Sequence, residues 1–225
     1  MRPGDQIAAP SYHRAVDQAF DRLLTPRLVV RRFTAADAPA FARYRSDPDV
    51  ARYQSWNAPF PLEQAQAFVA WLVDRHPDEP GEWYQVAIAS RDQPGRLLGD
   101  CGFRSRTDEP GIVDLGYSLA AEAQGYGYAT EAVGEVLRYL FEDRHKHKVC
   151  ADCDTRNRPS WQLLERLGFA REGELRESFR DADGWASEYL YGLLAPEWRA
   201  NRDPAPHAGA RAQPAVAGRA QQSRP

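Results

Sequence analysis

Residues 115–131 read Leu115-Gly116-Tyr117-Ser118-Leu119-Ala120-Ala121-Glu122-Ala123-Gln124-Gly125-Tyr126-Gly127-Tyr128-Ala129-Thr130-Glu131 and decide the fold. The stretch predicts a strand, a short loop and a glycine-punctuated turn that opens a helix, because apolar residues after Gly127 recur at helical spacing. A helix start presents unpaired backbone N–H groups and the positive end of its dipole. Glycines let an anion approach that backbone, so the turn is typical of a site for a phosphorylated cofactor.

Three known phosphate-binding motifs are possible interpretations of this stretch. A P-loop requires a Gly-Lys-Ser/Thr ending, which does not follow here. A dinucleotide fingerprint requires a third small residue where Thr130 stands, and no strand-turn-helix unit opens the chain. The spacing Gln124-x-x-Gly127-x-Ala129 after a strand resembles the pyrophosphate-binding signature of the GNAT superfamily of N-acetyltransferases. A helix entry that merely needs small residues remains the alternative.

Length and composition restrict the class of protein. The chain has 225 residues, of which 43% are hydrophobic and 27% charged, which fits one moderately large globular domain with tails. A net charge of −3 argues against nucleic-acid binding as the main role. The sequence contains neither a membrane-length apolar run nor a signal pattern, so no membrane association and a cytoplasmic location are expected.

The periodicities outside the glycine turn predict alternating helices and strands. They indicate a strand at 27–33, a helix from Thr34 to about Arg45, an irregular loop at 46–61, a helix at 62–76, strands at 83–89, 96–104, 112–119 and 149–154, a short helix at 157–168, and a closing hairpin of 169–179 and 185–194. Residues 12–24 are expected to form one short helix. Residues 199–225 are predicted to be disordered, because they lack aromatic residues.

The three cysteines do not indicate a disulfide framework or a metal site. Their number is odd, and Cys150 and Cys153 are expected to point to opposite faces of one strand. A Cys-x-x-Cys site needs both sulfurs together, usually with further ligands. We therefore expect no metal.

The order β-α-α-β-β-β-α-β-α-β-β over residues 25–198 resembles a complete GNAT domain, and the chain looks most like the group of ribosomal-protein N-terminal acetyltransferases. The strings that carry the resemblance are Thr25-Pro26-Arg27-Leu28, Arg52-Tyr53-Gln54-Ser55-Trp56, Gly116-Tyr117-Ser118-Leu119, Gly127-Tyr128-Ala129-Thr130-Glu131-Ala132, Asn157-x-x-Ser160 and Leu167-Gly168-Phe169. The resemblance implies an α/β (α+β) GNAT fold, with a mostly antiparallel sheet of about seven strands and four flanking helices. A central parallel pair of strands would part around the acyl-CoA arm. Residues 1–24 and 199–225 would then be an N-terminal extension and a tail.

The same resemblance implies a binding site for acetyl-CoA as co-substrate. Backbone groups of Ser118 and Leu119 would meet the pantetheine arm, and Asn157 its amide or acyl region. The pyrophosphate would lie on the turn, whose residues are Gln124, Gly125, Tyr126, Gly127, Tyr128, Ala129 and Thr130.

Direct acyl transfer requires a free amine, a polarised carbonyl and a proton for the departing thiolate. Asp114 is the predicted base, by analogy with acidic residues on the corresponding strand of related enzymes, and the N–H of Leu119 would polarise the carbonyl. Many members carry a tyrosine acid where this chain has Leu164, so Ser160 is the predicted acid. A surface carboxylate and a serine that bonds its own helix are the alternatives.

Trp56 and Tyr53 are expected to wall the acceptor site, although loop aromatics are often simply core residues. The acceptor amine stays open between a protein N-terminus, an aminoglycoside and a small metabolite. The chain is expected to be a monomer or a homodimer. Two other functions are compatible with the turn: a non-catalytic acyl-CoA-binding sensor, and a dinucleotide oxidoreductase.

Overall fold

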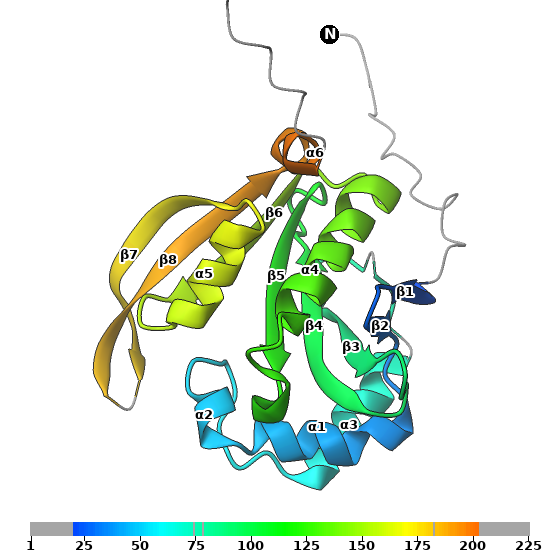
Figure 1. Cartoon of the computed structure of the whole chain (residues 1–225). Coiled ribbons are helices and arrows are strands. Elements are labelled where there is room, and N and C mark those ends of the chain that lie inside the picture. The colour runs from blue at the N-terminus through cyan, green and yellow to red at the C-terminus, as the bar shows by residue number, and fades with distance from the viewer. Residues whose placement is uncertain (1–19, 74, 78, 182, 203–225) are drawn as a thin grey trace, which may run out of the picture.

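The computed structural model describes residues 20–73, 75–77, 79–181 and 183–202. Its centre is one sheet of eight strands in the order β1-β2-β3-β4-β5-β6-β8-β7, in which only β5 and β6 pair in parallel (Figure 1). The strands are β1 (Arg22–Leu24), β2 (Leu28–Arg31), β3 (Tyr84–Ser90), β4 (Leu97–Ser105), β5 (Ile112–Leu119), β6 (Lys148–Asp154), β7 (Ala170–Asp181) and β8 (Gly184–Leu194). This confirms the predicted mixed, mostly antiparallel sheet.

Six α-helices accompany the sheet in the described part of the chain: α1 (Ala38–Arg45), α2 (Pro48–Ala51), α3 (Leu62–Val73), α4 (Tyr128–Arg138), α5 (Arg158–Arg166) and α6 (Ala195–Arg202). In Figure 1, α4 and α5 cross in front of the sheet, α1, α2 and α3 gather at the bottom, and the β7–β8 hairpin projects to the left. The first helical segment begins as predicted, because Asp37 bonds back to Thr34 in a capping box.

The core follows from the helical and strand periodicities. Ala132, Val133, Val136 and Leu137, all on one stripe of α4, are completely buried against the sheet. Burial of this kind contributes about 1.5–3 kcal/mol for each large aliphatic side chain, which holds α4 in place against β5. The start of α4 is therefore a fixed point beside the end of β5.

The two parallel strands part, as predicted. Pairing of β5 with β6 begins at Ile112 opposite Lys148 and ends at Asp114 opposite Cys150. Beyond that point β5 remains paired with β4 up to Leu119, and β6 remains paired with β8 up to Asp154. The facing edges of the two strands are consequently left without ladder partners over their last residues.

Both ends of the described chain differ from the sequence-based predictions. Residues 22–24 form strand β1 instead of the end of a helix, because Leu23 is buried and the segment pairs with β2, giving eight strands rather than about seven. Residues 199–202 belong to α6 instead of a disordered tail, since Trp198 stacks on Phe141 and holds that helix on the core. The rest of the predicted helix and tail, residues 12–19 and 203–225, lies outside the described residues.

Candidate active site

A pocket of about 540 Å³, which we call the turn pocket, occupies the gap between β5 and α5. Ten of the residues predicted to hold the coenzyme or the thiolate line it: Ser118, Leu119, Gln124, Gly125, Gly127, Tyr128, Ala129, Thr130, Asn157 and Ser160. Tyr126 is the exception, because its side chain is 63% exposed and is absent from the lining. The structure thus brings nearly all of the predicted binding set to one cavity.

The glycine turn owes its shape to two left-handed residues. Gly125 and Gly127 have φ values of 81° and 78°, and Gly127 is the N-cap of α4. A side chain at such a φ is strained, so the turn requires glycine at both positions. The result is a helix N-terminus whose backbone borders the pocket, which suits an anionic group of a ligand.

The N–H of Leu119 points towards the gap between the strands. The N–H of Ala120 donates to the Leu98 carbonyl on β4. Because neighbouring residues of a strand direct their backbone groups to opposite edges, the Leu119 groups face the side from which β6 has diverged. The Leu119 carbonyl accepts from Gln124 Nε2 at 3.1 Å. Leu119 lines the turn pocket, so its N–H can donate to a ligand there.

Two hydroxyl groups meet across the split. Tyr117 Oη lies 3.0 Å from Ser160 Oγ and 3.1 Å from the Ser160 carbonyl oxygen, so β5 and the first turn of α5 are linked. Burial raises the pKa of Tyr117 well above its usual value, which keeps the phenol protonated near neutral pH. Cys153 on β6 also contacts Ser160, and burial raises the pKa of its thiol to about 11. Ser160 therefore sits among uncharged donors.

A second pocket of about 570 Å³, the hairpin pocket, opens beside the first. It is lined by Pro48, residues 51–58, Asp152, Cys153, Asp154, Phe179, Arg180, Asp181 and Glu188. Tyr53 and Gln54 belong to the lining of both pockets, so the two cavities adjoin. Tyr53 and Trp56, which the sequence predicts to wall the acceptor site, both line this pocket.

Asp114 and Asp152 occupy different electrostatic environments. Burial alone would raise the pKa of Asp114, but hydrogen bonds from Arg106 and Arg104 at 2.8–3.0 Å outweigh it and lower that pKa. Asp152 is exposed on β6, and partial desolvation by the surrounding protein, together with the negative charges of Glu188 and Asp114, instead raises its pKa. Asp152 lines the hairpin pocket, whereas Asp114 lines neither pocket. Of the two carboxylates, Asp152 therefore borders a pocket, whereas Asp114 is engaged by two arginines outside both pockets.

A buried arginine, Arg45, packs against the ring of Trp56. Trp56 Nε1 donates to the Arg45 carbonyl at 3.1 Å, and the Arg45 guanidinium lies 3.9 Å from the centre of the Trp56 ring. Arg45 is itself buried and paired with Asp100, a buried carboxylate that also accepts from Tyr44. The loop of the hairpin pocket is thereby fixed to α1 and β4.

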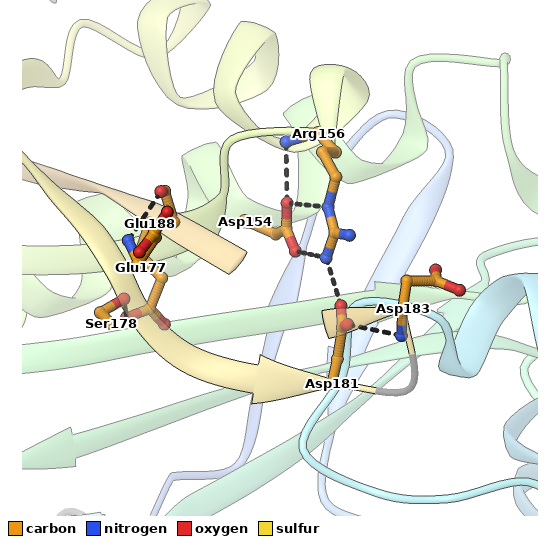
Figure 2. Close-up of polar contacts among 8 residues, drawn as sticks. Asp154, Arg156, Glu177, Ser178, Asp181, Asp183 and Glu188 are labelled. Carbon is orange, nitrogen blue, oxygen red and sulfur yellow. Dashed lines mark hydrogen bonds and ion pairs between the residues drawn. The ribbon is translucent and has the colours of Figure 1, made fainter. Parts of the chain in front are cut away.

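Arg156 ties the hairpin to the loop before α5 (Figure 2). Its guanidinium bonds both carboxylate oxygens of Asp154 at the end of β6 and reaches Asp181 at the tip of the β7–β8 hairpin. Hydrogen bonds from Arg156 lower the pKa of Asp181. The hairpin tip is thus fastened at the mouth of the hairpin pocket.

Sequence reasoning missed three residues at or beside these pockets. The sequence patterns gave no individual role to Tyr117, Asp152 or Arg27, which appeared only within longer strings or strands. Side-chain alternation along β6 places Asp152 on the face opposite Cys153. No local pattern indicates that the negative charge of Glu188 lies close to Asp152. Within the described residues no cluster of His, Cys, Asp and Glu suits a metal ion, and no helix is long and apolar enough to span a membrane.

Comparison with known proteins agrees with this geometry. Residues 27–170 match the family described as acetyltransferase (GNAT) domain. An uncharacterized N-acetyltransferase, YnaD of Bacillus subtilis, is 30% identical over 78% of this chain and 98% of its own length. The [ribosomal protein uS5]-alanine N-acetyltransferase of Escherichia coli is 34% identical over 39% of this chain and 45% of its own. A GNAT-family acetyltransferase structure from Bacillus anthracis superposes with a TM-score of 0.69 at 26% identity, covering 78% of this chain and 99% of that one. With the parted strands and the glycine turn, these matches make the chain a member of the GNAT family of acyl-CoA-dependent N-acetyltransferases.

Proposed function

We propose that this protein transfers the acetyl group of acetyl-CoA directly to a primary amine, with the coenzyme in the turn pocket and the amine in the hairpin pocket. The observation that carries the proposal is the adjacency of the two pockets at the parted ends of β5 and β6, with Tyr53 and Gln54 in both linings. A thioester at that junction is within reach of both cavities. No separate carrier is needed between donor and acceptor.

The coenzyme assignment rests on complementary chemistry along the turn pocket. Backbone N–H groups at the start of α4 suit the pyrophosphate, and the unpaired edge of β5 suits the amides of the pantetheine arm. Asn157 lines the same pocket beside the start of α5. The N–H of Leu119 would donate to the thioester carbonyl as negative charge develops on its oxygen.

Proton transfer is assigned to two groups on opposite sides of the thioester. An amine with a pKa near 8–10 is mostly protonated at neutral pH and must lose a proton before it attacks. Asp152, with its raised pKa and its place in the hairpin pocket, would accept that proton. The amine nitrogen then bonds the acetyl carbon and the carbon–sulfur bond breaks. Ser160 would donate its proton to the departing sulfur and regain one from the nitrogen as the amide forms, so that the products are the amide and the free thiol of CoA.

The acceptor we propose is the N-terminal amine of a protein, with small-molecule amines as the second class. Carboxylates of Asp152, Asp181 and Glu188 in the lining would attract a cationic ammonium. A pocket of about 570 Å³ has room for the first residues of an extended chain. The similarity to the alanine N-acetyltransferase of ribosomal protein uS5 supports this choice.

A thiol-release assay tests the proposal. Purified protein and acetyl-CoA should release free CoA thiol with at least one of three acceptor sets: ribosomal-protein N-terminal peptides, aminoglycosides and polyamines. The peptides should give the highest kcat/KM. A protein that binds CoA by calorimetry and releases no thiol with any set would instead be a binding module. Release confined to polyamines would overturn the protein N-terminus as the acceptor.

A further inference from the structure

The segment Thr25–Leu28 contacts the start of α4, although the two lie about a hundred residues apart. Glu131, in the first turn of α4, accepts from Thr25 Oγ1 at 2.5 Å and from the Arg27 backbone N–H at 2.9 Å. The other oxygen of Glu131 accepts from Arg27 Nε at 2.7 Å and pairs with Nη2 at 2.6 Å. Both oxygens of this carboxylate are therefore held by one short segment.

The same guanidinium reaches into the glycine turn. Arg27 Nη1 donates to the Tyr126 carbonyl oxygen at 3.0 Å, and the guanidinium carbon lies 4.7 Å from the centre of the Tyr128 ring. A Cβ added to Gly127 would lie 3.6 Å from Arg27 Nη2. Arg27 thus lies directly behind the turn and contacts it on both sides of Gly127.

The bond to Tyr126 determines the direction of the next amide. In a planar trans peptide the C=O of one residue and the N–H of the following residue point in opposite directions. Holding the Tyr126 carbonyl towards Arg27 therefore turns the Gly127 N–H away from it, and Gly127 lines the turn pocket. Flanking glycines at 125 and 127 would otherwise allow this peptide to rotate.

Charge gives Arg27 a second effect on the same pocket. Hydrogen bonds from Thr25 and Arg27 outweigh burial and lower the pKa of Glu131, so its carboxylate is ionised at neutral pH. A negative charge in the first turn of α4 would repel a diphosphate on that helix end. Arg27 neutralises it at 2.6 Å, which leaves the helix N-terminus free to attract an anion.

We propose that Arg27 is a positioning residue for the coenzyme: it orients the peptide between Tyr126 and Gly127 and neutralises Glu131, so that the turn can bind the diphosphate. The inference rests on the proposed binding of acetyl-CoA in the turn pocket. The string Thr25-Pro26-Arg27-Leu28, which leads into β2, would then contribute directly to the glycine turn.

The experiment compares two acetyl donors that share the thioester arm. Acetyl-CoA carries the diphosphate with its adenosine 3′-phosphate, whereas S-acetylpantetheine lacks both, so the effect of Arg27 is read as the change in preference between wild type and variant. Arg27→Ala should lower kcat/KM for acetyl-CoA on the order of tenfold to a hundredfold, as expected for loss of charge-assisted hydrogen bonds, and should leave kcat/KM for S-acetylpantetheine within about twofold. Arg27→Lys should not restore the loss, because an ammonium cannot make these directional contacts together.

Arg91→Ala is the matched control. Arg91 Nη1 bonds the Thr25 carbonyl at 2.8 Å, so it braces the same segment without contacting the turn. The control should keep the donor preference of the wild type. A double variant Arg27→Ala/Glu131→Gln should bind CoA more tightly than Arg27→Ala alone, because the unneutralised carboxylate is gone.

The outcomes separate this inference from the proposed function. A wild type that shows no preference for acetyl-CoA over S-acetylpantetheine would contradict binding of the diphosphate at the turn. A wild type that shows the preference, with Arg27→Ala retaining it or losing both donors equally, would overturn the role of Arg27.

Discussion

The turn pocket and the hairpin pocket adjoin, yet they are built differently. Nine of the nineteen residues that line the turn pocket come from one continuous stretch that runs from β5 through the glycine turn into α4, and the others come from α5 and from α2 with the loop after it. The hairpin pocket is assembled from the loop around Trp56, the end of β6 and both strands of the β7–β8 hairpin. The glycine turn of the first pocket is thus shaped by local backbone geometry, whereas the carboxylates of the second are brought together from separate strands. Variants can test whether this difference is also a division of labour.

The largest effect is expected from removing the carboxylate of Asp152. Asp152→Asn should lower kcat with the best amine on the order of a hundredfold to a thousandfold, the usual range for a lost general base, while KM for acetyl-CoA stays within about twofold. Asp114→Asn is the comparison: Asp114 is engaged by Arg104 and Arg106 outside both pockets, so loss of its charge should only lower the pKa of Asp152 and leave its carboxylate in place. Equal losses in the two variants would contradict the assignment of Asp152.

The pH profile follows from the raised pKa of Asp152. The wild-type rate should fall as pH drops, first because the acceptor amine becomes protonated and then more steeply as Asp152 is protonated. Because that pKa is raised, the steeper part should begin above the usual range for an aspartate. In Asp152→Asn the profile should keep only the fall caused by the amine, measured as kcat/KM against pH.

The second prediction concerns the turn. Gly127→Val forces a β-branched residue into φ 78°, which costs about 1–3 kcal/mol and displaces the amide that borders the pocket. CoA affinity measured by calorimetry should fall by tens of fold, on the order of that strain converted to a binding constant. Gly95→Val should bind CoA normally, since a Cβ there meets no atom within 4 Å. Unchanged affinity in Gly127→Val would separate the turn from the coenzyme.

The same contrast explains what could be predicted from the sequence. The spacing of Gln124, Gly127 and Ala129 after a strand indicated a phosphate-binding turn, and the resemblance that it carried implied a binding set of which all but Tyr126 line one pocket. That worked because the geometry of a glycine turn is encoded within a few residues. The parted strands were predicted through the resemblance to GNAT domains, because no pattern within either strand indicates where the pairing of β5 with β6 ends.

The acceptor side could not be predicted in the same way. The raised pKa of Asp152 comes from desolvation and from the charge of Glu188, which lies on another strand and comes close through the pairing of β6 with β8. Asp114 was the predicted base by analogy with related enzymes, and the sequence does not indicate that Arg104 and Arg106 engage it. Strand β1 was missed for a similar reason, because its pairing with β2 overrides a helix-like spacing of apolar residues.

The third prediction tests the hydroxyl pair that joins the two sides. Ser160→Ala should lower kcat about tenfold, and Tyr117→Phe should lower it by less, with KM for acetyl-CoA unchanged, as for loss of one neutral hydrogen bond. If Tyr117 acts through Ser160, the double variant should be no slower than Ser160→Ala alone. Tyr191→Phe is the control, because it also removes a buried phenol, one bonded to Glu165 outside both pockets. Losses that multiply would show that the two hydroxyls act separately.

The smallest effect is expected at the hairpin tip. Asp181→Asn removes the outer partner of Arg156 but leaves both bonds from Arg156 to Asp154, so the end of β6 should keep its place while the tip of the hairpin is released (Figure 2). The contact is exposed to solvent, where ion pairs contribute little. We therefore expect KM for the amine to rise only a few-fold, with KM for acetyl-CoA unchanged. Asp183→Asn is the matched control, because Asp183 joins this network only through its backbone N–H, which donates to Asp181. If Asp181→Asn changed only the KM for acetyl-CoA, the hairpin would act on the turn pocket. The two pockets would then not have separate roles in binding the coenzyme and the amine.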